Sequence, residues 1–496
     1  MTKVAAKTAP RIVGDERLLC RKAFSNGQWI DANDGTTLSV LNPADGSVVA
    51  EVPNLGVEET RKTIAAAYAA QPGWATLTAK ERATILRRWH DLMLENKEDL
   101  ARLMTAEQGK PLAESRGEVI YGASFVEWFA EEGKRIYGDV IPTHAAGKRI
   151  LVVKQPIGVV AAITPWNFPI AMITRKAGPA LAAGCTFIVK PAGETPLCAL
   201  ALAELATQAG IPAGVFNVLT TKDSRTMGVE LTGNPLVRKF SFTGSTEVGK
   251  VLMRQCADTV TKTSMELGGN APFIVFDDAD LDEAVLGAMA SKYRNAGQTC
   301  VCANRFLVQD SVYDAFAEKF TAAVATCKVG SGFEEGITIG PLINTAAVDK
   351  VEELVNDAVE HGARAIIGGE RDTASKNFYM PTVLVDVTRK MKIHDEEIFG
   401  PVATLFRFET EAEAVALAND TPYGLAAYFY ARDIGRIWRV QEGLDYGIIG
   451  VNEGIISTEV APFGGIKESG IGREGSKYGI EDFIEVKYIL QGGLTT

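Results

Sequence analysis

The sequence predicts an α/β protein built on two doubly wound parallel sheets, and three observations favour this fold class. The chain has 496 residues, more than the roughly 100 to 200 residues typical of one domain. From Arg149 onward, Val- and Ile-rich runs alternate with Ala-rich helical segments, and a second alternating block runs from Phe273 to Phe408. Because strands that alternate with helices usually pair in parallel, each block predicts one sheet.

The first third of the chain is expected to be mainly helical. Apolar residues at helical spacing predict helices over 60–70, 79–107 and 112–132, with Pro72 and the Gly109-Lys110-Pro111 turn as breaks. The elements expected for the first sheet are strands 156–164, 186–190, 215–218 and 239–242, with helices 169–183 and 196–208.

For the second sheet we expect strands 306–308, 365–367 and 402–406 around helices 310–326 and 346–361. The stretches 138–155 and 478–490 have the composition of strands but do not belong to either expected sheet, so they predict a small β flap. The chain is therefore divided into three units: 1–137 with 157–268, then 269–470, and the flap of 138–156 with 471–496.

Composition narrows the class of protein. Hydrophobic residues make up 46% and charged residues 23%, as in globular α/β enzymes. A net charge of -11 disfavours nucleic acids and anionic membranes as partners. No apolar run approaches the ~20 residues of a spanning helix, and the amino terminus lacks the apolar region of a signal peptide. Seven cysteines, an odd number, fit a reducing compartment. We predict a cytoplasmic location.

Cys300 is the candidate nucleophile. It lies in the polar, glycine-led segment Gly297-Gln298-Thr299-Cys300, an unusual place for an inert core thiol. Upstream, Glu266 stands before two glycines in Met265-Glu266-Leu267-Gly268-Gly269, where a carboxylate can act as general base. A lone cysteine is more often a small buried hydrophobe, and a lone glutamate there is usually a strand-end carboxylate, so neither residue is decisive alone.

Four segments are candidate dinucleotide contacts: 164–169, 190–196, 242–249 and 266–269. Gly244 and Ser245 follow an expected strand and open a helix, so bare N–H groups can face a pyrophosphate. A G-x-G-x-x-G motif is missing, and Val251 replaces the Ser/Thr of a P-loop, which disfavours nucleotide hydrolysis. The four histidines form no metal motif, so no metal is predicted.

The same motifs carry a family resemblance over nearly the whole chain. Pro165-Trp166-Asn167-Phe168-Pro169, the Glu266 and Cys300 segments, and Glu397-Ile398-Phe399-Gly400-Pro401 resemble the aldehyde dehydrogenase superfamily in its own order. The stretches 173–176, 462–467 and 472–475, with the Cys300 and Cys302 pair, resemble its succinate-semialdehyde dehydrogenase branch. The resemblance implies a Rossmann-like NAD(P)-binding domain (1–137 and 157–268), a catalytic domain (269–470), an oligomerisation flap and a homodimer or homotetramer.

The resemblance also implies a mechanism. Cys300 attacks the aldehyde carbon, hydride passes to the nicotinamide, and the resulting thioester is hydrolysed to the acid, with Glu266 as the base. The Asn167 side chain and the Cys300 backbone N–H stabilise the oxyanion. The cofactor contacts that it implies are Ile163, Thr164, Pro165, Trp166, Lys190, Ala192, Gly193, Glu194, Gly228, Gly244, Ser245, Leu267, Glu397 and Phe399.

Cofactor choice depends on Gly193, which stands where many NAD-preferring relatives carry a glutamate that repels a 2′-phosphate. Lys190 is near in sequence and could pair with that phosphate, whereas Glu194 opposes it. We therefore expect NADP to be accepted, with NAD use left open.

The substrate implied is a small anionic aldehyde. Arg175 and Arg294 match positions that bind the distal carboxylate of succinate semialdehyde, and Ser457 or Thr458 would add a hydroxyl. Glutarate semialdehyde and sulfolactaldehyde fit the same clamp, and either arginine could instead form a structural ion pair. A protein that keeps this scaffold without turnover is the alternative class, against which the intact thiol, acid and asparagine argue.

Cys302 has two interpretations. It is either an ordinary second thiol or the resolving partner of Cys300 in a reversible disulfide, which would form a redox switch. The sequence leaves both open.

Overall fold

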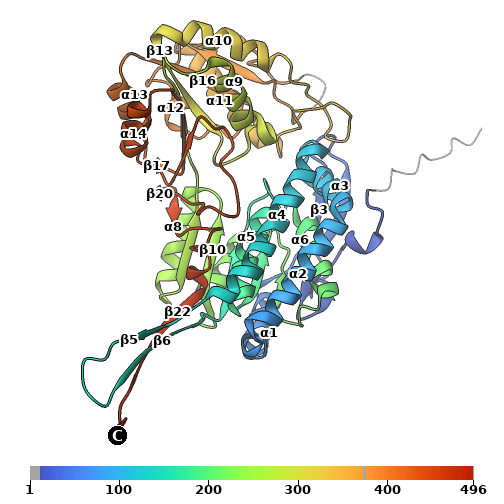
Figure 1. The fold of residues 1–496 in the computed structure, drawn as a ribbon. Helices are drawn as coiled ribbons and strands as arrows, with labels where there is room; N and C mark the ends of the chain where they lie inside the picture. Colours follow the sequence, from blue (N-terminus) through green and yellow to red (C-terminus); the bar gives the residue numbers. More distant parts are fainter. Residues whose placement is uncertain (1–11, 373–375, 495–496) are drawn as a thin grey trace, which may run out of the picture.

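A computed structural model describes residues 12–372 and 376–494. The first eleven residues of the predicted 1–137 segment and the last two of the flap lie outside the described residues. The chain forms two lobes, and a narrow β arm formed by β5, β6 and β22 extends from the lower one (Figure 1).

The first sheet has eight strands in the order β2-β1-β9-β8-β7-β10-β11-β21. Its five central strands are parallel, and the strands at the two edges are antiparallel. The chain passes outward from β7 to β9 and then returns to β10, so the strand order reverses between β7 and β10. Ligands of such sheets bind at the carboxyl ends of the strands at this switch point. The strands are β1 Ala23–Ser25, β2 Gln28–Ile30, β7 Val159–Ile163, β8 Thr186–Lys190, β9 Phe216–Val218, β10 Val237–Thr243, β11 Lys262–Glu266 and β21 Gly470–Ile471.

Helices cover this sheet and differ from the expectation at two points. The predicted helix 79–107 is two helices, because Asn96 ends one and begins the next while its Nδ2 donates to the Leu92 carbonyl at 2.8 Å. The first helix continues through Pro72, which has no N–H, so the Tyr68 carbonyl loses its helical donor. Both residues are exposed, so this carbonyl can accept a hydrogen bond from water instead. The helices are α1 Val57–Thr76, α2 Ala79–Glu95, α3 Lys97–Gln108, α4 Leu112–Glu132, α5 Ala171–Ala183, α6 Pro196–Ala209, α7 Ser224–Gly233 and α8 Thr246–Ala257.

The second sheet has seven strands in the order β14-β15-β16-β13-β12-β18-β19, parallel except for edge strand β14. The strands are β12 Ala271–Val275, β13 Ala303–Gln309, β14 Arg364–Ile367, β15 Thr382–Val385, β16 Val402–Phe408, β18 Ala426–Tyr430 and β19 Ile448–Val451. Its helices are α9 Leu281–Tyr293, α10 Asp310–Val324, α11 Thr345–Glu360, α12 Lys392–Asp395, α13 Glu411–Asn419 and α14 Ile434–Gly443. The predicted pair of α/β sheets is thus confirmed, with antiparallel edges that the prediction omitted.

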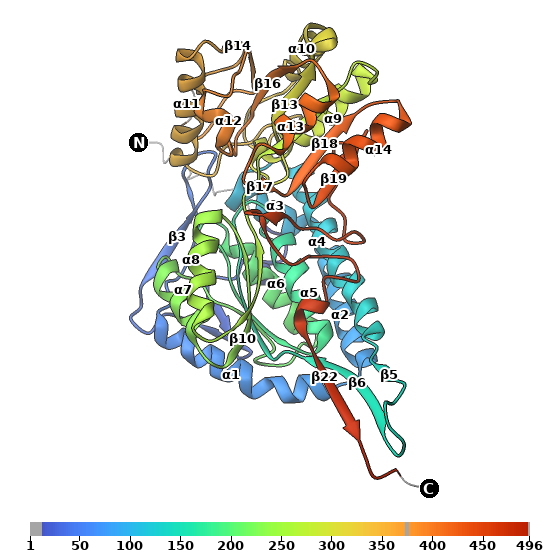
Figure 2. The same cartoon turned by 90° about the vertical axis from the view of Figure 1, so that its left-hand side faces the viewer.

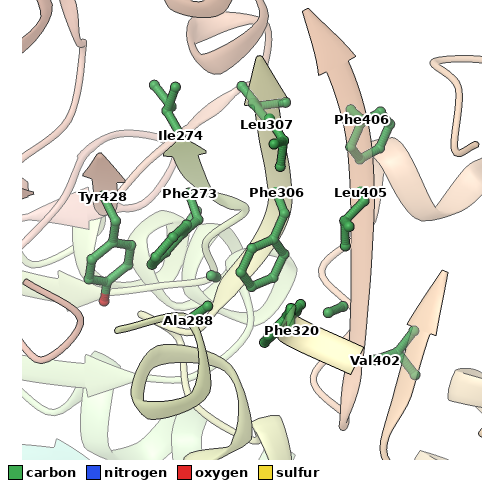
Figure 3. Close-up of a cluster of buried hydrophobic side chains, with 14 of the residues drawn as sticks. Phe273, Ile274, Ala288, Phe306, Leu307, Phe320, Val402, Leu405, Phe406 and Tyr428 are labelled. Carbon is green, nitrogen blue, oxygen red and sulfur yellow. The ribbon is translucent and has the colours of Figure 1, made fainter. Parts of the chain in front are cut away.

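Aromatic side chains fill the core of the second lobe. Phe273 and Phe306 lie on neighbouring strands with ring centroids 5.1 Å apart, and Phe320 of α10 packs on Phe306 at 5.3 Å (Figure 3). Alternate residues of β13 point to opposite faces, so Leu307 packs on the other side. This rigid sheet carries the loop of Cys300, which precedes β13.

The predicted flap strands form a three-stranded antiparallel sheet in the order β22-β6-β5, which projects from the body in both views (Figure 2). They are β5 Asp139–Ile141, β6 Arg149–Pro156 and β22 Ile484–Gln491. The remaining pairs are β3 Thr37–Leu41 with β4 Val48–Pro53, and β17 Tyr423–Gly424 with β20 Ile466–Lys467. Shortly before the flap strand β22, the chain touches the first sheet again at β21. The domain boundaries at 268 and 470 stay a prediction.

Within the described ranges, no helix is both long enough and apolar enough to cross a membrane.

Candidate active site

The loop that carries Cys300 is bent by three successive residues with positive φ. Asn295, Ala296 and Gly297 have φ of 51°, 54° and 78°, a region that is unfavourable for residues with a side chain. A Cβ atom at Gly297 would lie 2.1 Å from the Gly400 carbonyl oxygen, so glycine is required there. The bend therefore fits the Cys300 loop tightly against the loop of Glu397 and Phe399.

Cys300 faces a cavity of about 290 Å³ lined by residues of both lobes. The cavity brings together nine residues that the sequence singled out: Pro165, Trp166, Asn167, Gly244, Ser245, Leu267, Cys300, Glu397 and Phe399. Thr243, Gly268 and Ile398, which also line it, lie within segments that the sequence singled out, whereas the lining residues Ala347 and Lys350 were not predicted. Since Pro165 follows β7 and Gly244 follows β10, the cavity opens at the switch point of the first sheet.

The two glycines after Glu266 allow three motifs to meet. A Cβ atom at Gly269 would lie 2.6 Å from the Cys300 carbonyl oxygen, and one at Gly268 would lie 3.1 Å from Glu397 Oε2. The Gly269 N–H donates to Glu397 Oε1 at 3.2 Å. The Gly-Gly pair thus has a steric reason, which is the close approach of the loops that carry Cys300 and Glu397.

Asn167 is fixed against the Cys300 loop. Its Nδ2 donates to the Gln298 carbonyl at 3.0 Å, and its own carbonyl accepts from Lys110 Nζ at 2.7 Å. Lys110 is buried and also donates to Glu118 Oε2 at 2.5 Å. An amide nitrogen carries two hydrogens, so one N–H of Asn167 remains for a ligand in the cavity.

The Cys300 thiol is protonated at neutral pH. Burial raises its pKa to about 12, the negative charges of Glu397 and Glu266 add to the effect, and the Arg175 charge opposes it. Because the thiolate is the nucleophilic form, this thiol needs a base that removes its proton during attack.

The Glu266 carboxyl has the properties of such a base. Burial raises its pKa well above the usual range, and the negative charge of Glu474 raises it further. The positive charges of Arg175 and Lys176 lower it, but by less. Its Oε1 lies in the space that a side chain at Gly464 would fill, and its Oε2 has no hydrogen-bond partner among the residues described. A carboxylate with a raised pKa is a stronger base than an ordinary one.

Glu474 is the ionised partner of that carboxyl. Burial alone would raise its pKa, but the charges of Arg175 and Lys176 outweigh burial and lower it. Lys176 Nζ donates to Glu474 Oε1 at 2.6 Å and to Thr243 Oγ1 at 2.5 Å, and Arg175 forms an ion pair with Glu474. Of these two carboxyls, Glu474 therefore ionises more readily than an ordinary carboxyl, and Glu266 keeps its proton to a higher pH.

A second group of predicted cofactor residues lies outside the cavity, along the carboxyl ends of β7 and β8. The Thr164 N–H donates to the Lys190 carbonyl at 3.1 Å, and Lys190 Nζ donates to Ser224 Oγ at 2.7 Å. A Cβ atom at Gly193 would meet only the Thr221 carbonyl, at 3.7 Å, so space is open there. The other members are Ile163, Ala192, Glu194 and Gly228; Gly228 is beside Ile163.

These residues fit a dinucleotide. The α8 N-terminus at Ser245 presents backbone N–H groups at the switch point, where a phosphate is favoured. At one end, space is open at Gly193, and its neighbour Glu194 acts electrostatically on the Lys190 ammonium. At the other end, the Trp166 and Phe399 rings meet edge to face, 5.6 Å apart. Phe399 has φ of 57°, a strained value that is common at functional sites.

The two predicted substrate arginines differ in their surroundings. Arg175 is 2% exposed, pairs with Glu474 and lies 4.0 Å over the Phe463 ring, yet its Nη2 has no hydrogen-bond partner in the described part of the chain. Arg294 is half-buried and lies 5.2 Å over the Phe168 ring, and no described carboxylate forms an ion pair with it. Of the two cations, Arg294 is thus the one whose charge is not already paired with a described carboxylate.

Ser457 and Thr458 are distinguished by their neighbours. Ser457 and Arg294 line the same small cavity. The Thr458 hydroxyl instead donates to Glu459 Oε2 at 3.3 Å. Of the two predicted hydroxyls, the one beside Arg294 is that of Ser457.

Cys302 is 5% exposed, and its thiol donates to the Lys292 carbonyl at 3.6 Å. Both Cys300 and Cys302 are free thiols. Within residues 12–372 and 376–494, no group of three or more His, Cys, Asp or Glu side chains is arranged to hold a metal ion.

Sequence reasoning missed three residues of the site. Lys176 and Glu474 lie inside stretches that were singled out, 173–176 and 472–475, but no local pattern gives them a role. Lys350 donates from α11 to the Glu397 carbonyl at 2.7 Å, and no motif surrounds it. Their roles arise from contacts between distant parts of the chain.

A thiol and an amide donor line one cavity at the switch point of the first sheet, and a buried carboxyl of raised pKa acts electrostatically on that thiol. This is the arrangement expected of an enzyme with a cysteine nucleophile. The family model described as "Aldehyde dehydrogenase family" matches residues 29–489. The chain belongs to the aldehyde dehydrogenase family.

Several relatives are highly similar. Succinate-semialdehyde dehydrogenase [NADP(+)] GabD of Escherichia coli is 64% identical over 480 residues, 97% of this chain and 99% of the relative. Glutarate-semialdehyde dehydrogenase of Pseudomonas putida is 63% identical, over 96% of this chain and 98% of the relative. A 3-sulfolactaldehyde dehydrogenase of Pseudomonas putida is 61% identical, over 97% and 99%. The crystal structure of an E. coli NADP-dependent enzyme superposes with a TM-score of 0.96 at 64% identity and covers 97% of this chain and 100% of that one.

Proposed function

We propose that this aldehyde dehydrogenase oxidises a small anionic aldehyde to the acid with NADP or NAD, and that succinate semialdehyde is its substrate. The observation that carries the proposal is the pair of guanidinium groups, Arg175 and Arg294, near the nucleophile: Arg175 acts electrostatically on Cys300, and Arg294 stands six residues before it. A relative 64% identical carries this activity in its name.

The residues support the following course. Glu266 takes the proton of the Cys300 thiol as Sγ attacks the aldehyde carbon, and the Asn167 amide and the Cys300 N–H bind the oxygen of the thiohemiacetal. When bound, the nicotinamide supplies the acceptor for the hydride that leaves this carbon. Glu266 gives that first proton up to solvent and then takes one from a water that attacks the thioester; the acid is released, and the Cys300 thiolate that leaves takes this second proton from Glu266. The net change is the addition of one water and the loss of a hydride and a proton.

We expect the Arg294→Leu variant to separate anionic from neutral aldehydes. A charge-assisted hydrogen bond of about 1.5 to 3 kcal/mol corresponds to a roughly 10- to 100-fold rise in KM for succinate semialdehyde, while kcat/KM for butanal changes little. Arg294 is the better target because removal of Arg175 would leave the buried Glu474 without one of its two cations. Steady-state kinetics on both aldehydes measure the effect.

The wild-type protein is the reference in that experiment. A wild-type kcat/KM that is equal for butanal and succinate semialdehyde would contradict the anion pocket. Equal losses on both aldehydes in the variant would instead assign Arg294 a structural role. Glutarate semialdehyde, longer by one methylene, and sulfolactaldehyde, with a sulfonate, belong in the same panel because either could occupy the same clamp.

We expect Gly193→Glu to lower kcat/KM for NADP by roughly 10- to 100-fold, since a carboxylate there would face a 2′-phosphate. The open space at Gly193 accommodates the new side chain. Burial lowers the pKa of Lys190 to about 8, so a phosphate beside it would favour its charged form. NAD kinetics of the same variant serve as the control; a wild type that prefers NAD strongly, with no change in the variant, would refute this assignment.

The non-catalytic alternative predicts no aldehyde-dependent reduction of NADP or NAD. The intact set of Cys300, Glu266 and Asn167 argues against it.

Three further predictions concern the whole protein. Exposed apolar side chains on the flap, among them Val140 at 74%, favour pairing with a second copy of the chain, in a dimer or tetramer. A cytoplasmic location rests on the odd number of cysteines. A Cys300–Cys302 disulfide under oxidation would require the Cys302 thiol to leave its contact with the Lys292 carbonyl.

A further inference from the structure

Tyr121 on α4 carries a buried hydroxyl that has no hydrogen-bond partner among the residues described. Buried polar groups are nearly always paired, and an unpaired one destabilises the folded protein. Sequence reasoning gave this residue no role. The described part of the fold therefore does not supply the acceptor that this buried hydroxyl requires.

Tyr121 packs beside the aromatic rings over which the two substrate arginines lie. It packs against the cluster of Phe168, Ala171 and Met172, and the Arg294 guanidinium lies over the Phe168 ring. Its own ring meets Phe125 edge to face at 5.0 Å, and the Arg175 guanidinium lies 5.7 Å over that Phe125 ring. Tyr121 is thus connected to each cation through one aromatic side chain.

The electrostatic environment agrees with this position. Burial raises the pKa of the Tyr121 phenol, the charges of Arg175 and Arg294 lower it, and Glu474 and Cys300 raise it. The hydroxyl is therefore protonated at neutral pH and can donate. All four groups act on it, so it belongs to the space between the nucleophile and the arginines.

A second donor in this space also lacks an acceptor, namely Nη2 of Arg175. Two buried donors without partners in the described chain, together with the second cation at Arg294, are what a bound anion would require. A carboxylate offers two oxygens with about four lone-pair sites, enough for all three donors.

We propose that the Tyr121 hydroxyl donates a hydrogen bond to the distal anionic group of the aldehyde, as a third member of the pocket formed with Arg175 and Arg294. The inference rests on the proposed function and deepens it. The two positive charges attract any anion, whereas a neutral hydroxyl binds it only along the direction of its O–H. Tyr121 is therefore a specificity-determining residue.

The test compares Tyr121→Phe with the wild type on succinate semialdehyde and butanal. We expect a roughly 10- to 100-fold higher KM for succinate semialdehyde, because a hydrogen bond to a charged group is lost. We expect kcat to change little, and kcat/KM for butanal to stay the same. The inhibition constant of the product succinate should rise in parallel, which a purely structural defect would not produce.

Tyr379→Phe is the matched control. Tyr379 lies in the other lobe and also has a buried hydroxyl without a partner in the described chain, so the same atom is removed far from the cavity. Unchanged kinetics on succinate semialdehyde in Tyr121→Phe, or equal losses on both aldehydes, would overturn the inference. If the wild type does not prefer succinate semialdehyde to butanal, the proposed function fails first and this inference with it.

Discussion

Replacement of Cys300 by alanine is expected to lower kcat for aldehyde oxidation by roughly 10⁴- to 10⁶-fold, the order seen when a catalytic nucleophile is removed. The cavity offers no second thiol that could substitute, since Cys302 points to the Lys292 carbonyl. Reduction of NADP in the presence of succinate semialdehyde measures the rate.

Cys302→Ala is the matched control for this change. It removes a thiol two residues away, buried and outside the cavity lining, so most of the activity should remain. Equal losses in both variants would mean that the loop, rather than the Cys300 thiol, is what the substitutions damage.

Replacement of Glu266 by glutamine is expected to lower kcat by roughly 10²- to 10⁴-fold, the usual contribution of a general base. The pH dependence follows from the direction of the pKa shift. Because the pKa of Glu266 is raised well above the usual range of a carboxyl, its carboxyl keeps the proton to a higher pH and becomes a base only as pH rises. Wild-type activity should therefore increase from neutral to alkaline pH, and the variant should lose this limb.

Glu107→Gln is the control for that profile. Burial raises the pKa of Glu107 to about 8, but its carboxylate accepts from the Leu197 and Cys198 N–H groups at 2.7 and 2.8 Å, away from the cavity. This variant should keep the alkaline limb. A pH profile unchanged in Glu266→Gln would remove Glu266 from the role of base.

The loops that meet at the candidate active site could be predicted because each carries a local sequence pattern. A cysteine after a glycine-led turn, and an acid before two glycines, can each be recognised within six residues. The structure explains these glycines, because Gly269 and Gly297 leave space for backbone oxygens of facing loops. The two sheets could be predicted for a similar reason, since each strand and helix has its own periodicity of apolar residues.

Other features depend on contacts that no local pattern encodes. The helix break at Asn96 lies within a continuous apolar periodicity, and short edge strands such as β14 and β21 do not reveal their direction. Lys176 and Glu474 are 298 positions apart in the chain. The arrangement that raises the pKa of Glu266 and lowers that of Glu474 therefore exists only in the folded protein.

The residue that carries the acyl group during turnover identifies the nucleophile. Glu266→Gln should slow thioester hydrolysis, so incubation with succinate semialdehyde and NADP should leave a succinyl group on the enzyme. Mass spectrometry of the digested protein should place that group on the peptide of Cys300, and Cys300→Ala should show none. A succinyl group on another residue, or a modification that forms equally without NADP, would contradict Cys300 as the nucleophile of an oxidative reaction.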